Sequence, residues 1–341
     1  MNKKAVVYFD ILNILACLCV IGMHVNGIAH NLDNSPAWYR SFVVEVLAYW
    51  AVPVFFMLSG ATMMNYRERY TTATFIKRRI KKIGIPLVFW TTVFYLWFLH
   101  EGVYVWSGFR NLINMVINFE VVGVYWFFPP LLVIYMSMPV LSKLSNDKNI
   151  LWYMIVVGVA ANSVFPFACK LLGLSYYGYF YFTLTGEYIL YPLVGYYLHT
   201  TELKPWKCNV IYLFGIAGAF MRYFHTVWTL NTQGVASTMT WGYINLPTLA
   251  MAVAVFVFIK NVSKGKFWQK DAVKKVLREL SSASFGIYLI HVFVMNAVAG
   301  KFGIDRSGIP WQMLGAVIIY VICLGIVKIL QKLPFGGYIF P

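Results

Sequence analysis

Charged residues are scarce in this chain of 341 amino acids. They make up 12% of the sequence, about half the share of a soluble domain, while 60% of the residues are hydrophobic. This composition excludes an ordinary soluble protein and leaves no soluble domain of useful size. Acidic residues are the rarest, with 12 Asp and Glu against 28 Lys and Arg, for a net charge of +16. The basic residues gather in short segments between apolar runs, so we expect no binding of nucleic acid.

Cysteine is also sparse, and its positions exclude two kinds of site. The five cysteines show no metal-ligand spacing, and most lie inside apolar runs, where they behave as small hydrophobes: Cys17, Cys19, Cys169, Cys208 and Cys323. We therefore expect neither a disulfide framework nor a metal site. Linkers rich in Gly, Ser or Pro are lacking, as is a clear internal repeat. We expect one domain over residues 1–341, and the missing repeat argues against a transporter built from inverted repeats.

Apolar runs that approach about 20 residues, enough to cross roughly 30 Å of hydrocarbon as a helix, recur along the whole chain. They predict an all-α, polytopic membrane protein with about ten transmembrane helices. The first run is not a signal peptide, because Asp10 and Asn13 interrupt it and no small-residue cleavage site follows. The expected spans are 6–26, 42–64, 86–106, 125–142, 150–168, 181–198, 208–229, 242–260, 282–300 and 312–332.

The distribution of basic residues predicts the orientation of these spans. If both termini are cytoplasmic, 22 of the 28 Lys and Arg fall on the inner side, as the positive-inside rule requires. The inner segments are Lys3 and Lys4, 67–82, 143–148, 204–207, 260–278 and the C-terminal end. One inner segment, "KFWQKDAVKKVLREL" (266–280), is either an interfacial helix on the inner leaflet or a basic anchoring loop. The positive-inside rule favours the loop.

Three polar residues interrupt the first span, "YFDILNILACLCVIGMHVN" (8–26). On a helix, the step from Asn13 to His24 turns through about 20° net and rises about 16 Å, so the two residues share a face. Asp10 lies within about 60° of the same face. Polar side chains at such depth usually face a bundle interior or a wet cavity, which favours a functional site. A structural role, in which His24 and Asn13 form hydrogen bonds between helices, is the alternative.

The same stretch resembles the first span of the acyltransferase type 3 family of membrane proteins. That family has an Asp, an Arg three residues later and a His eleven beyond; Asp10 and His24 match, whereas Asn13 stands in place of the Arg. Four further stretches match in the same order: "VPVFFMLSG" (52–60), "FIKRRIKKIGIP" (75–86), "YWFFPPLLVIYMSMPVL" (125–141) and "SSASFGIYLIH" (281–291). The resemblance thus covers nearly the whole chain. It is greatest to the small single-domain O-acetyltransferases of surface glycans, of the enterobacterial common antigen type.

The resemblance implies an enzyme that takes an acyl group, usually acetyl from cytoplasmic acetyl-CoA, and passes it to a hydroxyl of a cell-surface or lipid-linked glycan. It also implies a multi-pass protein surrounded by the lipid of the bacterial cytoplasmic membrane. The rise of about 16 Å from Asn13 to His24 is comparable with an extended pantetheine arm, so a thioester could reach His24 while the nucleotide stays cytoplasmic. The residues fix neither the acyl group, acetyl or succinyl, nor the acceptor sugar. The sequence also leaves open whether the protein forms a homo-oligomer.

Acyl transfer from a thioester to an alcohol needs a base for the hydroxyl proton. His24 is the candidate, because an imidazole can take and return a proton at neutral pH. Glu45, at a similar depth in the second span, could orient this imidazole through its other nitrogen, but a salt bridge from Glu45 to Arg40 fits the sequence equally well. The candidate catalytic residues are therefore His24, Asp10, Asn13 and Glu45.

A cluster of basic residues stands on the cytoplasmic side, directly before the third expected span. It consists of Arg78, Arg79, Lys81 and Lys82, with Arg79-x-x-Lys82 where the family has two arginines. These residues are candidates for binding the phosphates of CoA, since cationic clusters pair strongly with phosphate. Positive-inside anchoring explains them equally well. Because Asn13 carries no charge, either the cation of the family's first span comes from elsewhere, such as this cluster, or the donor site differs.

Six further residues are candidates for binding the acceptor: Trp126, Glu187, Arg222, His225, Tyr288 and His291. Charges within apolar runs are costly and tend to pair, so a structural bridge between Glu187 and Arg222 competes with an acceptor groove. Aromatic residues at span ends also form ordinary interfacial belts.

A transporter or flippase of a small polar substrate or glycan is the alternative function, because it too would need a polar path through the bundle. The two functions differ in what they require of His24. A base is indispensable for acyl transfer, whereas a path-lining His could often be replaced by another polar residue with partial function.

Overall fold

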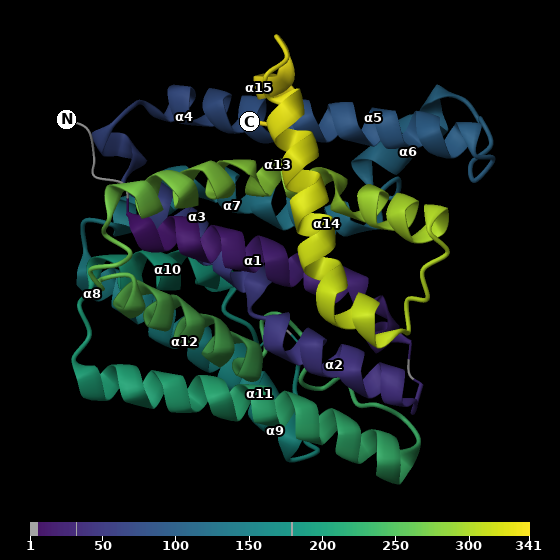
Figure 1. Ribbon diagram of the computed structural model, residues 1–341. Helices are drawn as coiled ribbons and strands as arrows, with labels where there is room; N and C mark the ends of the chain where they lie inside the picture. The colour runs from purple at the N-terminus through teal and green to yellow at the C-terminus, as the bar shows by residue number, and fades with distance from the viewer. Residues whose placement is uncertain (1–5, 32, 179) are drawn as a thin grey trace.

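A computed structural model describes residues 6–31, 33–178 and 180–341. Within these ranges all regular structure is helical, and the long helices lie side by side in one bundle, as Figure 1 shows. The first helix runs through the middle of the bundle, where it packs against α2, α3, α12, α13 and α14. The predicted all-α, polytopic membrane fold is confirmed.

The helices follow one another along the chain with short connections. They are α1 (Val7–Val25), α2 (Pro36–Ala48), α3 (Ala51–Met63), α4 (Thr72–Arg79), α5 (Ile85–His100), α6 (Phe109–Ile117), α7 (Phe128–Leu144), α8 (Lys148–Val159), α9 (Phe165–Leu171), α10 (Leu190–Thr200), α11 (Pro205–Gln233), α12 (Leu246–Val262), α13 (Asp271–Lys301), α14 (Ile309–Leu330) and α15 (Gly336–Ile339). Single turns of other helix types are η1 (Gly27–His30), η2 (Tyr66–Glu68), η3 (Ile80–Gly84), η4 (Gly123–Phe127), η5 (Ala160–Val164) and η6 (Thr183–Thr185).

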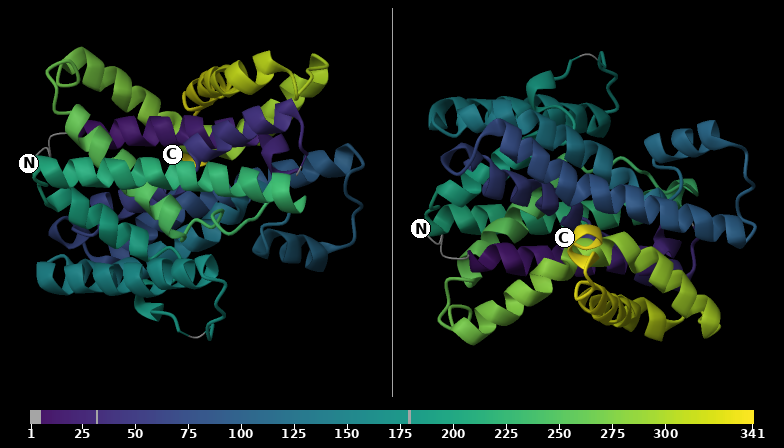
Figure 2. Two further views of the ribbon diagram at one scale, coloured as in Figure 1. Left: turned by 90° about the horizontal axis from the view of Figure 1, so that it is seen from below. Right: turned by 90° about the horizontal axis from the view of Figure 1, so that it is seen from above.

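Eight helical segments in the described part of the chain are long and apolar enough to cross a membrane. They correspond to eight of the ten expected spans. The other two expected spans contain shorter helices, α12 with 17 residues and α10 with 11. Outside the bundle proper, α5 and α6 extend away from one side, which both views of Figure 2 show.

The span expected at 181–198 is a helix only in its second half, so this prediction was wrong in its first half. Apolar composition alone does not make a helix, and Asn162 of η5 holds the preceding segment in an irregular form. Its amide nitrogen donates to the Phe182 carbonyl (3.0 Å), and its oxygen accepts from the Phe182 amide (2.8 Å). A non-helical backbone is tolerated inside a membrane protein when such groups satisfy it.

The segment 266–280 is helical along most of its length, so the favoured prediction of an anchoring loop was wrong. From Asp271 it belongs to α13, a single helix of 31 residues and hence roughly 46 Å long. That length exceeds the hydrocarbon thickness by about half. The helix contacts α1 from Ser281 to His291, so its basic first turns precede the part that packs against α1.

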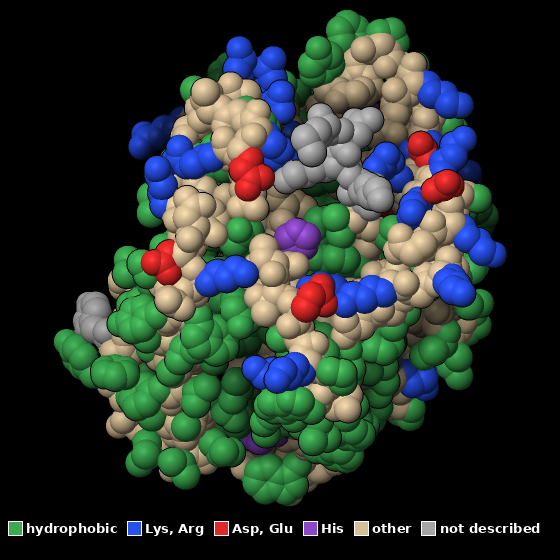
Figure 3. Space-filling view, turned by 90° about the vertical axis from the view of Figure 1, so that its left-hand side faces the viewer, with side chains coloured by type: hydrophobic (Ala, Val, Ile, Leu, Met, Phe, Trp, Pro, Cys, Tyr) green, Lys and Arg blue, Asp and Glu red, His purple; other side chains and the backbone are tan. Residues whose placement is uncertain are grey.

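One end of the bundle carries most of the basic segments, and we call it the basic end. Here α1, α4, α8, α11 and α13 begin, at the left of Figure 1. Figure 3 shows this end face-on, with Lys and Arg side chains spread across it and few acidic ones. Lys3 and Lys4 lie outside the described residues. The cytoplasmic placement of the basic end stays a prediction of the positive-inside rule.

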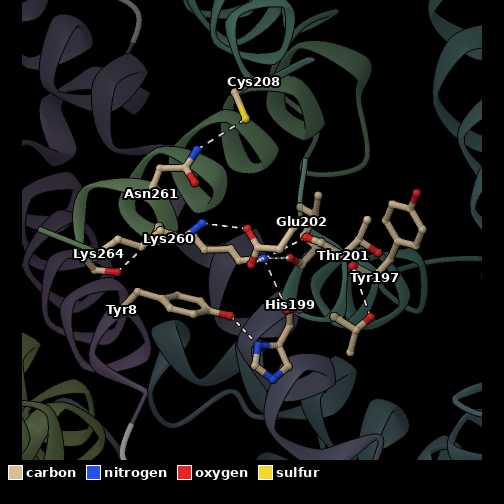
Figure 4. Close-up of polar contacts among 12 residues, drawn as sticks. Tyr8, Tyr197, His199, Thr201, Glu202, Cys208, Lys260, Asn261 and Lys264 are labelled. Atoms are coloured by element: carbon tan, nitrogen blue, oxygen red, sulfur yellow. Dashed lines mark hydrogen bonds and ion pairs between the residues drawn. The ribbon is translucent and has the colours of Figure 1, made fainter. Parts of the chain in front are cut away.

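A buried lysine joins two helices at the basic end (Figure 4). Lys260 of α12 donates to the carbonyl oxygens of Leu198 and Thr201 (2.8 Å each), at the end of α10. Its ammonium also lies 3.2 Å from the carboxylate of Glu202. Beside it, the Tyr8 hydroxyl of α1 is 2.6 Å from Nδ1 of His199. These bonds fix the ends of α10 and α12 next to the start of α1.

Candidate active site

A cavity of about 480 Å³ lies inside the bundle, along the exposed side of α1. Its wall comes from α1, α3, η3, η4, α7 and α13, and Tyr243 closes part of it. Asp10 and His24, both in the wall, are fourteen residues apart on α1, so the cavity extends for about 20 Å along that helix. A space of this length fits an elongated ligand better than a small compact one.

Seven of the fourteen candidate residues line this one cavity: Asp10, Asn13, His24, Arg79, Lys82, Trp126 and Tyr288. They come from four stretches that are far apart in the sequence: α1, residues 79–82, η4 and α13. The structure therefore brings the polar stripe of the first span together with half of the basic cluster and two of the family-motif aromatics. His291 lies directly behind the wall, bonded to His24.

His24 and His291 form a hydrogen-bonded pair at the end of the cavity away from the basic end. Nδ1 of His291 lies 2.7 Å from the carbonyl oxygen of Tyr288, and a carbonyl can only accept, so this nitrogen carries the hydrogen. Nε2 of His291 is then an acceptor for Nδ1–H of His24, 2.7 Å away. In the neutral pair, this arrangement leaves Nε2 of His24 with a free lone pair. His24 is thus held in the tautomer that a general base requires.

Glu45 does not orient His24, and this prediction was wrong. The carboxylate of Glu45 is buried and lies 3.6 Å from the guanidinium of Arg222 and 3.9 Å from the imidazole of His30. The alternative partner, Arg40, instead donates to Gln312 (2.7 Å). Glu45 and Arg222 lie on α2 and α11, two helices that pack together outside the cavity.

Asn13 connects α1 to α13 at the other end of the cavity. Its amide donates to the carbonyl and to the hydroxyl of Ser281, at 2.9 and 3.0 Å. The carboxylate of Asp10 interacts favourably with Ser281 and with the charge of Arg278, one turn earlier on α13. Arg278 is thus one source of positive charge near Asp10.

The basic cluster divides into two pairs. Arg79 and Lys82 line the cavity, and within the described part of the chain neither forms an ion pair with a carboxylate. Nε of Arg79 is buried without a hydrogen-bond partner. Arg78 lies over the ring of Tyr70 (4.7 Å), and Lys81 is exposed away from the cavity. The π-helical turn η3 begins just after Arg79 and contains Lys82, and such turns are frequent at functional sites.

Two candidates for acceptor binding, Glu187 and His225, are not part of the cavity wall. Glu187 is exposed in the loop before α10 and does not pair with Arg222, so the expected bridge was wrong. His225 is on α11, next to Trp228, with its ring 6.4 Å from that of the indole. Arg222 reaches the cavity indirectly, because its guanidinium stacks on Tyr49 (3.4 Å), and Tyr49 stacks on the cavity residue Tyr243 (4.3 Å).

A family model described as an acyltransferase domain, acyltransferase type 3, matches residues 6–328. The chain belongs to this acyltransferase family. Neither a curated protein nor a solved structure matches it. Membership makes the chain a multi-pass membrane acyltransferase, and the cavity that joins the first span to the basic motif is its candidate active site.

The acyltransferase cavity also contains residues that sequence reasoning missed. They are Ser59, Thr62, Tyr135, Tyr243, Ser281, Ser282 and Ser284. A signal for two of them was present, because Ser281, Ser284, Tyr288 and His291 follow at helical spacing and share one face. No comparable signal marks Tyr135 or Tyr243, each of which is an aromatic residue in an apolar segment.

Proposed function

We propose that this acyltransferase moves an acetyl group from acetyl-CoA to a hydroxyl of a cell-surface or lipid-linked glycan, with His24 as general base. The observation that carries the proposal is the bonded chain from the Tyr288 carbonyl through His291 to His24, because it leaves Nε2 of His24, a residue of the cavity wall, unprotonated.

The proposed acyl transfer has two steps. Nε2 of His24 takes the proton of the acceptor hydroxyl as the oxygen attacks the thioester carbonyl carbon, and a carbon–oxygen bond forms. The carbon–sulfur bond then breaks, and the thiolate of CoA takes the proton back from His24. His291 stabilises the imidazolium between the steps, since Nδ1–H of His24 stays bonded to its acceptor nitrogen.

The opposite end of the cavity suits the nucleotide of the donor. Arg79 and Lys82 present two cations without carboxylate partners in the described part of the chain, and such groups bind phosphate strongly. Placing the phosphates there and the thioester at His24 uses the whole length of the cavity. The donor would then enter from the basic end, which the positive-inside rule assigns to the cytoplasm.

The reacting end offers a flat aromatic surface to the acceptor. Trp126 stacks on Tyr243 (5.4 Å between ring centroids, 19° between planes), and Tyr243 stacks on Tyr49. A sugar ring can pack on such a face while its hydroxyl points to His24. A bacterial cytoplasmic membrane, with the glycan on its outer side, is the location that this arrangement fits.

Transfer of labelled acetyl from acetyl-CoA to the glycan fraction, in inverted membrane vesicles, tests the proposal. We compare the wild type with His24→Ala and with His100→Ala, a matched control on an exposed histidine at the end of α5. We expect the His24 variant to lose at least about 10²-fold in rate, the low end of what a positioned base contributes. The control is expected to retain full activity.

Each outcome has a distinct meaning for the proposal. If the wild type transfers no label from acetyl-CoA, the acetyl-donor proposal is wrong, and succinyl-CoA and then substrate uptake become the next assays. If His24→Ala transfers at the full rate, His24 is not the base. Uptake of a polar substrate that survives His24→Gln would support the alternative of a carrier.

A further inference from the structure

Ser284 differs from the other hydroxyl residues on the helices around the cavity. Serine and threonine inside a helix commonly donate to a carbonyl of the preceding turn. Ser59 donates to Phe55 (3.1 Å) and Thr62 to Leu58 (2.7 Å) in this way. The hydroxyl of Ser284 is buried, with the side chain 2% exposed, and has no hydrogen-bond partner.

The surroundings of Ser284 place this hydroxyl in the cavity wall. Ser284 lines the cavity, and its backbone carbonyl is already in contact with Sγ of Cys17 on α1 (3.5 Å). Because a buried polar group without a partner is costly and rare in native proteins, an unpaired hydroxyl at a cavity indicates a ligand that completes its bonding.

The position of Ser284 along the cavity defines what that ligand group is. Ser284 precedes His291 by seven residues of α13, hence by about 10 Å along the helix axis. His291 is bonded to His24, so Ser284 also lies about 10 Å from the reacting end. The pantetheine arm carries two amides, and the second is roughly 10 Å from the thioester sulfur, the length of about three extended residues.

The chemistry of the wall between the two ends agrees with this length. Neutral hydroxyl groups from Ser59, Thr62, Tyr135 and Ser284 line the cavity, and its charged residues are Asp10, Arg79 and Lys82. A hydroxyl can donate to an amide oxygen and accept from an amide N–H. A purely apolar acyl chain would leave the Ser284 hydroxyl without a partner, whereas an amide-containing arm would satisfy it.

We propose that the Ser284 hydroxyl binds the second amide of the pantetheine arm and so sets how far the acyl donor enters toward His24. This inference rests on the proposed function and deepens it, because it states which part of the donor the cavity recognises. It predicts that donors are selected for a pantetheine arm with both amides, independently of the phosphates bound by Arg79 and Lys82.

Inhibition by fragments of the donor tests the inference. Pantetheine contains both amides, whereas N-acetylcysteamine contains only the first. We measure the inhibition constant of each against acetyl-CoA for the wild type, for Ser284→Ala and for Tyr320→Phe. The last variant is a matched control, since the Tyr320 hydroxyl is also buried and unpaired but lies outside the cavity.

For Ser284→Ala we expect the inhibition constant of pantetheine to rise about threefold to tenfold, the value of one hydrogen bond. The constant of N-acetylcysteamine should stay the same, and Tyr320→Phe should change neither. Equal changes for both fragments, or no change for either, would overturn the inference. So would a wild type that transfers acetyl but is inhibited by neither fragment.

The melting temperature and the acetyl transfer of the wild type separate a failure of this inference from a failure of folding or of the proposed function. The melting temperature of Ser284→Ala in detergent should match the wild type, because the substitution removes no bond within the protein. A wild type without acetyl transfer would overturn the proposed function itself. A wild type that transfers acetyl, with a Ser284→Ala variant that binds pantetheine normally, would overturn only the role of Ser284.

Discussion

At the scale of single residues, a substitution in the His24–His291 pair should separate the orientation of the His24 imidazole from the binding of the donor. His291→Phe keeps a ring of similar size but removes the acceptor for Nδ1–H of His24, so the tautomer of His24 is no longer selected. We expect kcat to fall by roughly 10²-fold, within the range of general base catalysis, with little change in the KM for acetyl-CoA. Steady-state kinetics measures kcat and KM separately, on a preparation whose melting temperature matches that of the wild type. A rise in KM with normal kcat would contradict the orienting role.

The buried pair of Glu45 and Arg222 leads to a prediction about stability. The Arg222 guanidinium donates to the Thr240 carbonyl (3.1 Å) and stacks on Tyr49, but its charge is compensated by Glu45. Glu45→Ala would leave that charge unpaired, at a cost of about 3–5 kcal/mol. The double variant Glu45→Leu with Arg222→Met removes both charges and should recover most of this loss.

Thermal unfolding in detergent compares the two variants. A Glu45→Ala protein with unchanged stability and no transferase activity would mean that Glu45 acts in the chemistry after all. The matching result for Arg222→Met alone should be a similar loss of stability, because a buried carboxylate is then left unpaired.

At the scale of elements, two glycines determine how closely α3 and α10 pack. A methyl group on Gly195 would overlap the carbonyl oxygen of Met57, and one on Gly60 would overlap that of Pro192. Small residues at such crossings let membrane helices approach closely. We expect Gly195→Ala to destabilise the protein by about 1–3 kcal/mol, as overpacking typically does.

The matched control for this crossing is Gly325→Ala on α14, where an added methyl meets nothing within 4 Å. It should be neutral or slightly stabilising, since alanine favours helix more than glycine by about 1 kcal/mol. Melting temperatures in detergent measure both. Equal effects of the two substitutions would show that helix propensity, and not the crossing, decides the outcome.

The elements also show how far the sequence alone predicts this molecule. Apolar runs located eight of the ten expected spans as helices long enough to cross a membrane, because the length and composition of a span are local properties. They failed where a distant side chain changed the backbone, as Asn162 does to the segment around Phe182. The stripe on α1 was likewise local, but the partner of His24 is 267 residues away, and only the fold brings it near.

At the scale of the whole molecule, the proposed reaction requires an acyl donor and an acceptor that meet from opposite sides of the membrane. The cavity extends from the unpaired cations at the basic end to His24, so this requirement holds only if the basic end is cytoplasmic. The two ends of α13 offer a direct comparison, because Lys275 and Lys301 are both exposed and lie about 39 Å apart on one helix.

Single cysteines at these positions test the orientation. Four of the five native cysteines are buried and Cys19 is partly so, hence the background labelling should be low. In intact cells, a membrane-impermeant maleimide should label Lys301→Cys, and Lys275→Cys only after the membrane is inverted. The reverse pattern would place Arg79 and Lys82 outside, where no acetyl-CoA is available, and would contradict the proposed direction of transfer. Because both cysteines are on the same helix, a difference in labelling reports the membrane between them and not a difference in local folding.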